Sequence, residues 1–276
     1  MKTMLIFGLG YTARAIARRL ADDGWHIEAT GRAGTLNFAD EAGVRAALAR
    51  ADAVLSSVPP AEDVDPVLAR YGADLAGVGS GGGWLGYLSS TGVYGDCGGA
   101  WVDESAPVVG LGGSGRRAAR ALADAAWLER GARVLRLPGI YGPPMNGQEG
   151  RSAFDRLRQG RAHRVDLPGQ IFSRIHVEDI ARAAHAALSA PPGAYNIADD
   201  IPAPQNAVIE EACRISGLPL PPLLAESDVP PASRAFYAEN RRVANGKAKR
   251  VLGWRPRFAD YRAGLRAIWE GESGGG

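Results

Sequence analysis

The sequence predicts an α/β protein built on a doubly wound parallel sheet. Three observations lead to this fold class. Short apolar runs are typical of strands buried on both faces, helix-period segments alternate with them, and the chain has 276 residues. A chain of this length fits one large domain, or one domain with a small added lobe, and can bury a core without a metal or a disulfide.

The alternation of strands and helices is regular through the first half of the chain. The expected strands are 3–7, 26–30, 53–58, 84–89 and 133–137. The expected helices are 11–23, 41–50, 63–75 and 113–130. Elements of these lengths form right-handed βαβ units and hence a parallel sheet.

After Pro138 the pattern loosens and prolines become frequent. Helices are expected at 152–159, 177–189, 205–216 and 260–270, and short strands at 170–176 and 194–198. We therefore predict a core at 1–138 and a mixed region at 139–270 that completes the sheet and forms a small C-terminal substrate lobe. The glycine-rich tail at 271–276 is predicted to be disordered.

Composition gives no indication of a nucleic-acid or membrane partner, of a disulfide or of a metal site. The 32 basic and 30 acidic residues are well mixed, which gives no reason to expect nucleic acid or an anionic membrane. No stretch approaches the ~18 apolar residues of a membrane span, and the first apolar run is too short for a signal peptide, so a cytoplasmic location is expected. Cys97 and Cys213 lie far apart and the four histidines lack metal-ligand spacing, so neither a disulfide nor a metal site is expected.

A glycine-rich turn directly follows the first expected strand. The segment Gly8-Leu9-Gly10-Tyr11-Thr12-Ala13 has the pattern G-x-G-x-x-A. Gly8 permits a tight turn, Gly10 lets the backbone approach a pyrophosphate, and Ala13 lets helix and strand pack closely. An ordinary tight turn is the alternative, but free N–H groups at a helix start attract phosphate, and the position favours a dinucleotide site on a Rossmann-type sheet.

The residues at the end of the second strand indicate which nicotinamide dinucleotide, NAD or NADP, the chain binds. An NAD enzyme usually places a carboxylate there to bind the ribose 2′-hydroxyl. The chain reads Thr30-Gly31-Arg32, and Glu28 lies inside the strand. Because arginine can bind the 2′-phosphate through two donors, NADP is predicted over NAD. The alternative is that Arg32 is an exposed loop residue without a ligand.

Five later segments resemble the extended short-chain dehydrogenase/reductases, the NAD(P)-dependent epimerase/dehydratase family, and most closely their atypical branch. They are LSSTGVYG (88–95), LRLPGIYGP (135–143), RIHVEDIARAAHAAL (174–188), AYNIADD (194–200) and RRVANGKAKRVLGW (241–254). The resemblance implies an NAD(P) cofactor, a small-molecule substrate, and a monomer or homodimer. It also implies cofactor contacts from Tyr11, Thr12, Ser57, Val58, Pro59, Ser89, Pro138, Gly139 and Ile140.

The same resemblance implies catalytic residues, and here the chain departs from the family. Ser90, with Thr91 beside it, holds the place of the hydroxyl that hydrogen-bonds the reacting substrate oxygen. The alternative is that these hydroxyls only satisfy backbone groups. Where the family has Y-x-x-x-K, this chain has Arg116 in place of the tyrosine and Arg120 in place of the lysine. Arg120 can still hydrogen-bond the ribose, but arginine keeps its proton, so Arg116 cannot shuttle one.

Other residues could replace the missing tyrosine or bind a substrate. Tyr94 and Tyr141 lie in segments that border the cofactor in relatives, and His163 titrates near neutrality, although each could be structural. Arg116 could stabilise an oxyanion while water completes the proton transfer. Arg174 could contact a substrate anion or form a surface salt bridge.

Two functions are consistent with these features. The first is an NADP(H)-dependent oxidoreductase or epimerase acting on a carbonyl, hydroxyl or nucleotide-sugar-like substrate. The second is a non-catalytic NADP(H)-binding sensor or scaffold, which the missing tyrosine favours.

Overall fold

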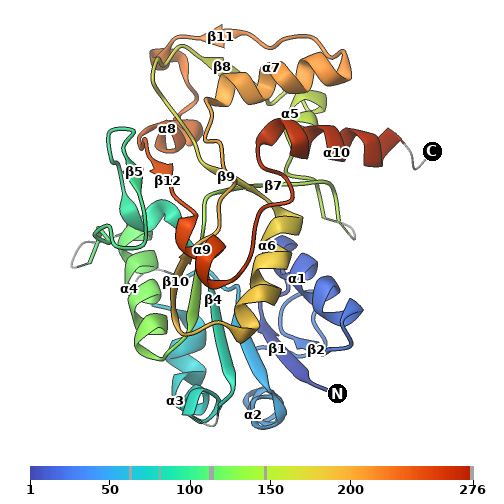
Figure 1. Cartoon of the computed structure of the whole chain (residues 1–276), viewed down its shortest axis with the longest axis vertical. Coiled ribbons are helices and arrows are strands. Elements are labelled where there is room, and N and C mark those ends of the chain that lie inside the picture. Colours follow the sequence, from blue (N-terminus) through green and yellow to red (C-terminus); the bar gives the residue numbers. More distant parts are fainter. Residues whose placement is uncertain (62–63, 81, 112–114, 146–147, 274–276) are drawn as a thin grey trace.

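The computed structural model describes residues 1–61, 64–80, 82–111, 115–145 and 148–273. A six-stranded parallel sheet organises the chain (Figure 1). Its strands are β1 (Thr3–Phe7), β2 (His26–Ala29), β3 (Ala53–Ser56), β4 (Trp84–Ser90), β6 (Arg133–Leu137) and β10 (Gly193–Asn196). They lie in the order β10-β6-β4-β3-β1-β2, and every neighbouring pair is parallel. The predicted fold class is confirmed.

The strand order reverses at β1. The chain leaves β1 to form β2 on one side and then crosses to form β3 on the other side. In open α/β sheets, ligands bind outside the carboxyl ends of the strands at such a switch point. The topology therefore predicts ligand binding at the residues that follow Phe7 and Ser56.

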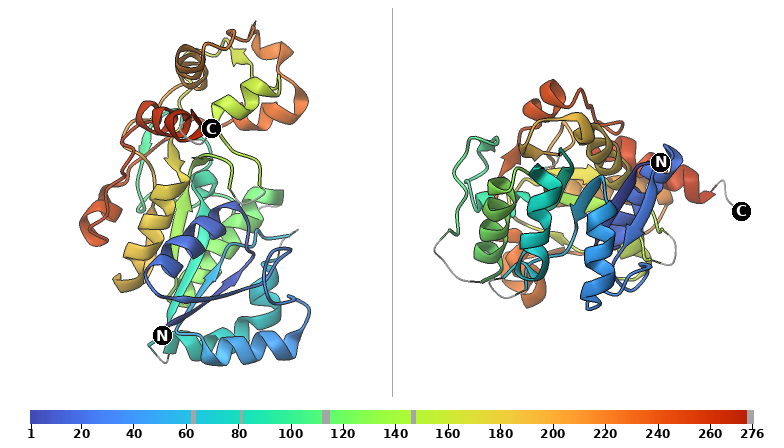
Figure 2. Two further views of the ribbon diagram at one scale, coloured as in Figure 1. Left: turned by 90° about the vertical axis from the view of Figure 1, so that its right-hand side faces the viewer. Right: turned by 90° about the horizontal axis from the view of Figure 1, so that it is seen from below.

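Helices cover both faces of the sheet (Figure 2). They are α1 (Tyr11–Asp22), α2 (Glu41–Arg50), α3 (Pro66–Ser80), α4 (Gly115–Glu129) and α6 (Val177–Ala186). α1 and α6 pack on the face that carries Met4 and Ile6, whereas α2, α3 and α4 pack on the face that carries Leu5 and Phe7. Successive residues of a strand point to opposite faces, so an unbroken apolar strand supplies both cores.

The remaining elements form a lobe above the carboxyl ends of the strands (Figure 1). Its helices are α5 (Ala153–Arg158), α7 (Gln205–Ser216), α8 (Pro231–Tyr237) and α10 (Tyr261–Ser273). α5, α7 and α10 share a small core around Phe154 and Leu265. Two short strand pairs lie between the lobe and the sheet: β7 (Gly139–Tyr141) with β9 (Arg174–His176), and β5 (Trp101–Val102) with β12 (Arg242–Val243). A third pair, β8 (Arg164–Val165) with β11 (Leu223–Leu224), lies within the lobe. A further short helix, α9 (Gly246–Val251), packs beside β10.

Several predicted element boundaries are wrong. The strand expected at 26–30 ends at Ala29, and the strand expected at 53–58 ends at Ser56. The strand expected at 170–176 begins only at Arg174. The tail prediction is wrong for 271–273, because α10 continues to Ser273 and Glu272 pairs with Arg158 at 2.6 Å. The expected helix starts at Asp63 and Gly113 lie outside the described residues, as do 274–276.

The described residues include neither a candidate membrane-spanning helix nor a candidate metal site. Within these ranges no helix is long and apolar enough to cross a membrane. The same ranges contain no group of three or more histidine, cysteine or acidic side chains arranged to hold a metal ion.

Candidate functional site

The turn after β1 lies between the ends of β2 and β3. Gly8 has a φ of +84°, a conformation that favours glycine, and its N–H donates to the Thr30 hydroxyl at 3.2 Å. The Leu9 N–H donates to the Thr30 carbonyl at 2.9 Å. A Cβ at Gly8 would lie 3.0 Å from a methyl group of Val58. The turn is therefore fixed at the switch point, and it has little room for a side chain at position 8.

Gly10 faces open space at the start of α1. It is the N-cap residue, it makes no side-chain cap, and the first turn contains no acidic residue. A Cβ at Gly10 would meet no heavy atom of the described chain within 4 Å. An anion can therefore approach the first-turn N–H groups, which point outward with the positive end of the helix dipole.

The side chains of the first helical turn face inward. Ala13 is fully buried against the sheet, and Tyr11 and Thr12 are also buried. The Tyr11 hydroxyl donates to the Pro143 carbonyl at 2.8 Å. The contacts that Tyr11 and Thr12 are expected to make with the cofactor would therefore come from their backbone N–H groups.

Arg32 is exposed in the turn that follows β2. Its guanidinium makes no hydrogen bond or ion pair with any residue that the structure describes. By contrast, Glu28 is bound by Arg50 through two hydrogen bonds of 2.8 and 2.5 Å. The one carboxylate of β2 thus has a partner already, whereas the cation at its end is available to a ligand phosphate.

Ser89 and Ser90 point to different parts of the molecule. The buried Ser89 hydroxyl donates to Asp124 at 2.6 Å, so the expected cofactor contact of Ser89 would come from its backbone. The Ser90 hydroxyl accepts a hydrogen bond from the Gly92 N–H at 3.1 Å, and both Ser90 and Thr91 line a cavity. Ser90 therefore has a backbone role and also faces a possible substrate.

A buried polar network holds the end of β4 to α4, β6 and β10. Arg136 binds Asp124 through hydrogen bonds of 3.1 and 2.7 Å, and both side chains are almost fully buried. Arg136 also donates to the Tyr94 hydroxyl at 2.9 Å, which donates to Asn196 at 2.8 Å. The Tyr94 hydroxyl is thus held by structural partners and does not line the cavity, which favours the structural alternative for this residue.

The helix that should carry Y-x-x-x-K offers no side chain to the cavity within its described part. Arg116 is exposed and Arg120 is half-buried, and neither lines the cavity. Arg120 donates to the Tyr87 hydroxyl at 2.7 Å and to the Leu88 carbonyl at 3.3 Å. These two hydrogen bonds hold Arg120 against β4, and its expected ribose contact, like the expected oxyanion contact of Arg116, stays a prediction.

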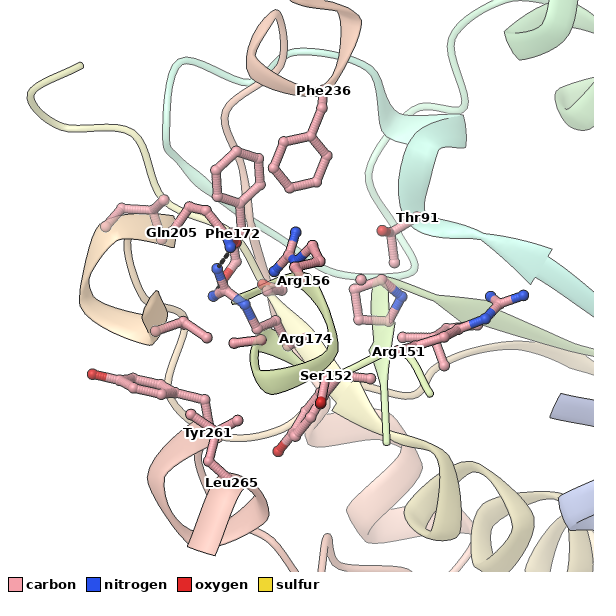
Figure 3. A pocket seen from close by; sticks show the side chains of 18 of the residues that line it. Thr91, Arg151, Ser152, Arg156, Phe172, Arg174, Gln205, Phe236, Tyr261 and Leu265 are labelled. Atoms are coloured by element: carbon pink, nitrogen blue, oxygen red, sulfur yellow. Dashed lines mark hydrogen bonds between the residues drawn. The ribbon is translucent and has the colours of Figure 1, made fainter. Parts of the chain in front are cut away.

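A cavity of about 790 Å³ extends from the ends of β4 and β6 into the lobe (Figure 3). At the sheet it is lined by Ser90, Thr91, Pro138, Gly139 and Ile140. In the lobe it is lined mainly by residues of α5, α7, α8 and α10 and of the segments before them. Ser57, Val58 and Pro59 follow β3 at the same edge of the sheet, half-buried or exposed. Most of the predicted cofactor positions thus follow the carboxyl ends of adjacent strands.

Arg174 lines the cavity with most of its donors already bound. It is 8% exposed and donates to the Phe172 carbonyl at 2.9 Å, the Ala203 carbonyl at 2.8 Å and the Gln205 side chain at 2.9 Å. Burial lowers the pKa of Arg174 to about 10. The alternative of a surface salt bridge is wrong because the side chain is buried.

The other acid–base candidates are poorly placed to donate a proton. Tyr141 lines the cavity, but its hydroxyl lies 3.5 Å from the Asp260 carbonyl, and burial together with the Asp199 carboxylate raises its pKa. His163 does not line the cavity, and its ring lies 6.2 Å from that of Tyr237.

The cavity residues that the sequence did not reveal include Arg151, Arg156 and Phe236. The run from Arg151 to Arg161 carries four arginines within a short predicted helix and its flanks, which was a usable signal of an anion site. Phe236 lies on α8, which was not predicted at all, and no sequence pattern connects it to α5.

His176 gives the fold a specific response to acid. Its Nδ1 accepts from the Glu178 N–H at 3.3 Å, its Nε2 is buried without a partner among the described residues, and burial together with Arg257 lowers its pKa to about 4. As pH falls below 6.5, the unfolded state takes up a proton that the folded state resists until about pH 4. This difference should remove about 3 kcal/mol of stability over that interval.

The variant His176→Asn keeps an N-cap acceptor and removes the titrating ring. We expect its free energy of unfolding to depend less steeply on pH between 6.5 and 4 than that of the unchanged chain. Urea denaturation at half-unit pH steps measures both slopes. Parallel curves would contradict the assignment of this acid sensitivity to His176.

Two proteins similar to this chain in sequence align with it over very different lengths. No protein-family model matches the chain. A functionally unknown conserved protein from Silicibacter pomeroyi is 41% identical, with 97% of this chain and 98% of that chain aligned at a TM-score of 0.83. A 3-diazoavenalumate denitrifying reductase from Streptomyces is 31% identical over 138 residues, which span 48% of this chain and 45% of the reductase.

More distant solved structures share the fold. A UDP-glucose 4-epimerase from Thermotoga maritima, with UDP-glucose, is 18% identical with a TM-score of 0.76 and 99% of each chain aligned. A human epimerase family protein with NADPH is 15% identical with a TM-score of 0.71, covering 97% of this chain and 99% of that chain. These neighbours have the extended short-chain dehydrogenase/reductase fold predicted from the sequence.

Proposed function

We propose that this chain, which belongs to the same family as the conserved Silicibacter pomeroyi protein, is an NADP(H)-dependent reductase of a small molecule bound in the lobe cavity. The observation that carries the proposal is the pairing of an uncapped, open turn at Gly10 with an unpaired arginine at the end of β2. The first can hold a pyrophosphate and the second a 2′-phosphate. The partial likeness to a reductase supports the direction of reaction.

The residues present fit a dinucleotide along the carboxyl edge of the sheet. The N–H groups at the start of α1 would hold the pyrophosphate, Arg32 the 2′-phosphate, and the segments after β3 and β6 would border the rest of the cofactor. Bound NADPH would supply a hydride to the substrate. Ser90 and Thr91 line the cavity where the substrate would meet the cofactor, so their hydroxyls would orient the acceptor group.

The substrate should be one that needs no proton from a side chain when it takes the hydride. Asp155 accepts from Ser152, Glu239 pairs with Arg117 and Arg241, and burial raises the pKa of both Tyr141 and Tyr261. When the acceptor is a cation such as an aryl diazonium group, the hydride forms a C–H bond as the C–N bond breaks and N2 leaves, so no alkoxide remains to be protonated. The name of the Streptomyces relative, a denitrifying reductase of a diazo compound, fits this class of acceptor.

A second candidate function is a non-catalytic NADP(H) sensor or scaffold. It is favoured by α4, on which Arg116 faces solvent and Arg120 is bound to β4. Absorbance at 340 nm separates the two functions when NADPH and the protein are mixed with electron-poor aldehydes, quinones and aryl diazonium salts. Enzyme-dependent NADPH oxidation by any of these supports the reductase. Tight NADPH binding without oxidation by the whole panel supports the sensor.

Arg32→Ala tests the choice of cofactor. We expect the Kd for NADPH to rise about 10- to 100-fold, because the charge-assisted hydrogen bonds to the 2′-phosphate are lost, whereas the Kd for NADH should not change. Calorimetric titration with both nucleotides measures the difference. Arg18→Ala is a matched control, since Arg18 is an exposed arginine further along α1. An equal rise in the Kd of both nucleotides would contradict the assignment of Arg32 to the 2′-phosphate.

A further inference from the structure

The lobe end of the cavity is rich in positive charge. Its lining includes five arginines and only two carboxylates, namely Arg151, Arg156, Arg161, Arg174 and Arg241 against Asp155 and Glu239. A concave surface with this excess of cations attracts an anionic ligand, because the protein wall beside it screens charge less than water does.

Four of these arginines already have partners. Arg174 has the three acceptors described above, and Arg241 binds the Gly95 carbonyl at 2.6 Å and pairs with Glu239. Arg161 contacts Gln159 and lies 3.8 Å from Glu149. Arg151 lies over the Tyr11 ring at 4.8 Å.

Arg156 differs from the other four. Within the described chain its guanidinium makes no hydrogen bond, ion pair or ring contact, although it lies on the cavity wall. In Figure 3 its side chain lies close to Arg174 and Phe172, on the side of the cavity away from Arg151. One available guanidinium can hold one carboxylate through two parallel hydrogen bonds.

An aromatic wall stands beside Arg156. The rings of Phe172 and Phe236 stack with centroids 4.3 Å apart and an interplanar angle of 11°. Tyr237 packs edge-on against Phe236 at 5.2 Å, which fixes the orientation of the stack. Phe236 nevertheless remains 47% exposed at the cavity, so one large apolar side chain is kept in contact with solvent. A flat apolar ligand would cover it.

We propose that the cavity binds a planar aromatic carboxylate, with Arg156 paired to the carboxylate and the ring packed on Phe236. This inference rests on the proposed function, since it names the class of substrate that the reductase would take. The carboxylate and ring contacts lie in the lobe, whereas Ser90 and Thr91 lie at the sheet. A ligand that spans the cavity therefore presents its far end to the hydride donor.

Calorimetric titration of the full chain tests the proposal with trans-cinnamate as the probe. We expect cinnamate to bind more tightly than its neutral isostere cinnamamide and more tightly than hexanoate, a carboxylate without a ring. Arg156→Gln should raise the Kd of cinnamate by about tenfold or more and leave the Kd of cinnamamide unchanged. Phe236→Ala should weaken the binding of both aromatic probes, cinnamate and cinnamamide.

Arg158→Gln is the matched control, because Arg158 lies on the same helix, pairs with Glu272 and does not line the cavity. It should bind cinnamate as the unchanged chain does. Comparison of cinnamate with cinnamamide on the unchanged chain tests the need for charge even if a variant fails to fold.

Three results would overturn the proposal: equal affinity for cinnamate and cinnamamide, no loss in Arg156→Gln, or tighter and Arg156-dependent binding of UDP-glucose. Each titration is performed with and without saturating NADP⁺, whose own binding is measured first. Failure to bind NADP⁺ counts against the proposed function, whereas failure to prefer cinnamate under either condition counts against this inference.

Discussion

Asp124→Ala is expected to lower the free energy of unfolding by about 3–5 kcal/mol, because it leaves the buried Arg136 without its counter-charge. Asp124 is 1% exposed and accepts from both Arg136 and Ser89. Removal of the carboxylate breaks three buried hydrogen bonds at once and leaves the guanidinium buried without an ion-pair partner. Urea denaturation at neutral pH measures the loss.

Two companion variants separate charge from packing. Ser89→Ala removes one hydrogen bond of the same network and should cost about 1 kcal/mol. The pair Asp124→Leu with Arg136→Met replaces the ion pair by apolar side chains and should recover much of the stability lost in Asp124→Ala. A loss below about 1 kcal/mol in Asp124→Ala would show that the ion pair contributes little to the fold.

Gly10→Val is expected to remove measurable NADPH binding while leaving the protein folded. Gly10 has a φ of −86° and a ψ of −171°, which valine adopts without strain, and its Cβ would meet no protein atom within 4 Å. The side chain would instead occupy the space from which a pyrophosphate reaches the helix N–H groups. Loss of two charge-assisted hydrogen bonds raises the Kd by about 100-fold or more.

Gly77→Val provides the control for Gly10→Val. Gly77 lies on α3 with open space around its Cβ position, so valine there changes the helix without touching the turn. Both variants should retain the circular dichroism of the unchanged chain, and only Gly10→Val should lose NADPH in calorimetry. Normal affinity in Gly10→Val would mean that no phosphate approaches this turn.

The sheet and its covering helices could be predicted because local pattern and tertiary packing agree there. The elements Thr3–Phe7, Glu41–Arg50, Arg133–Leu137 and Gln205–Ser216 have the predicted bounds. The helix expected at 63–75 instead runs from Pro66 to Ser80, since Asp65 caps it through the Val67 and Leu68 N–H groups. Its last turn contains Gly77 and Gly79, which the sequence pattern assigned to a loop.

The lobe was harder to predict because its short elements depend on distant partners. The strands β5, β8, β11 and β12 have two residues each, and their pairing joins segments from different parts of the chain. No local periodicity marks a strand of this length. The helix α8 follows two prolines in a polar segment and was missed for the same reason.

The residue types of the site could be predicted better than the directions of their side chains. The turn at Gly8–Gly10 and the cluster of strand ends follow from fold topology, which the sequence pattern specifies. Whether Ser89 or Ser90 faces the cavity, and whether Tyr94 is enclosed, depends on Asp124, Arg136 and Asn196. These come from α4, β6 and β10, and only the folded chain brings them together.

The attachment of Arg120 to β4 has a consequence for any attempt to install a Y-x-x-x-K tyrosine in this chain. A tyrosine introduced at position 116 would find the cation one helical turn away already held by the Tyr87 hydroxyl and the Leu88 carbonyl. Its phenol would therefore gain no hydrogen bond from Arg120 unless that guanidinium first left β4. The single substitution Arg116→Tyr is thus not expected to give the chain a proton donor, whereas its combination with Arg120→Lys and Tyr87→Phe would release the cation.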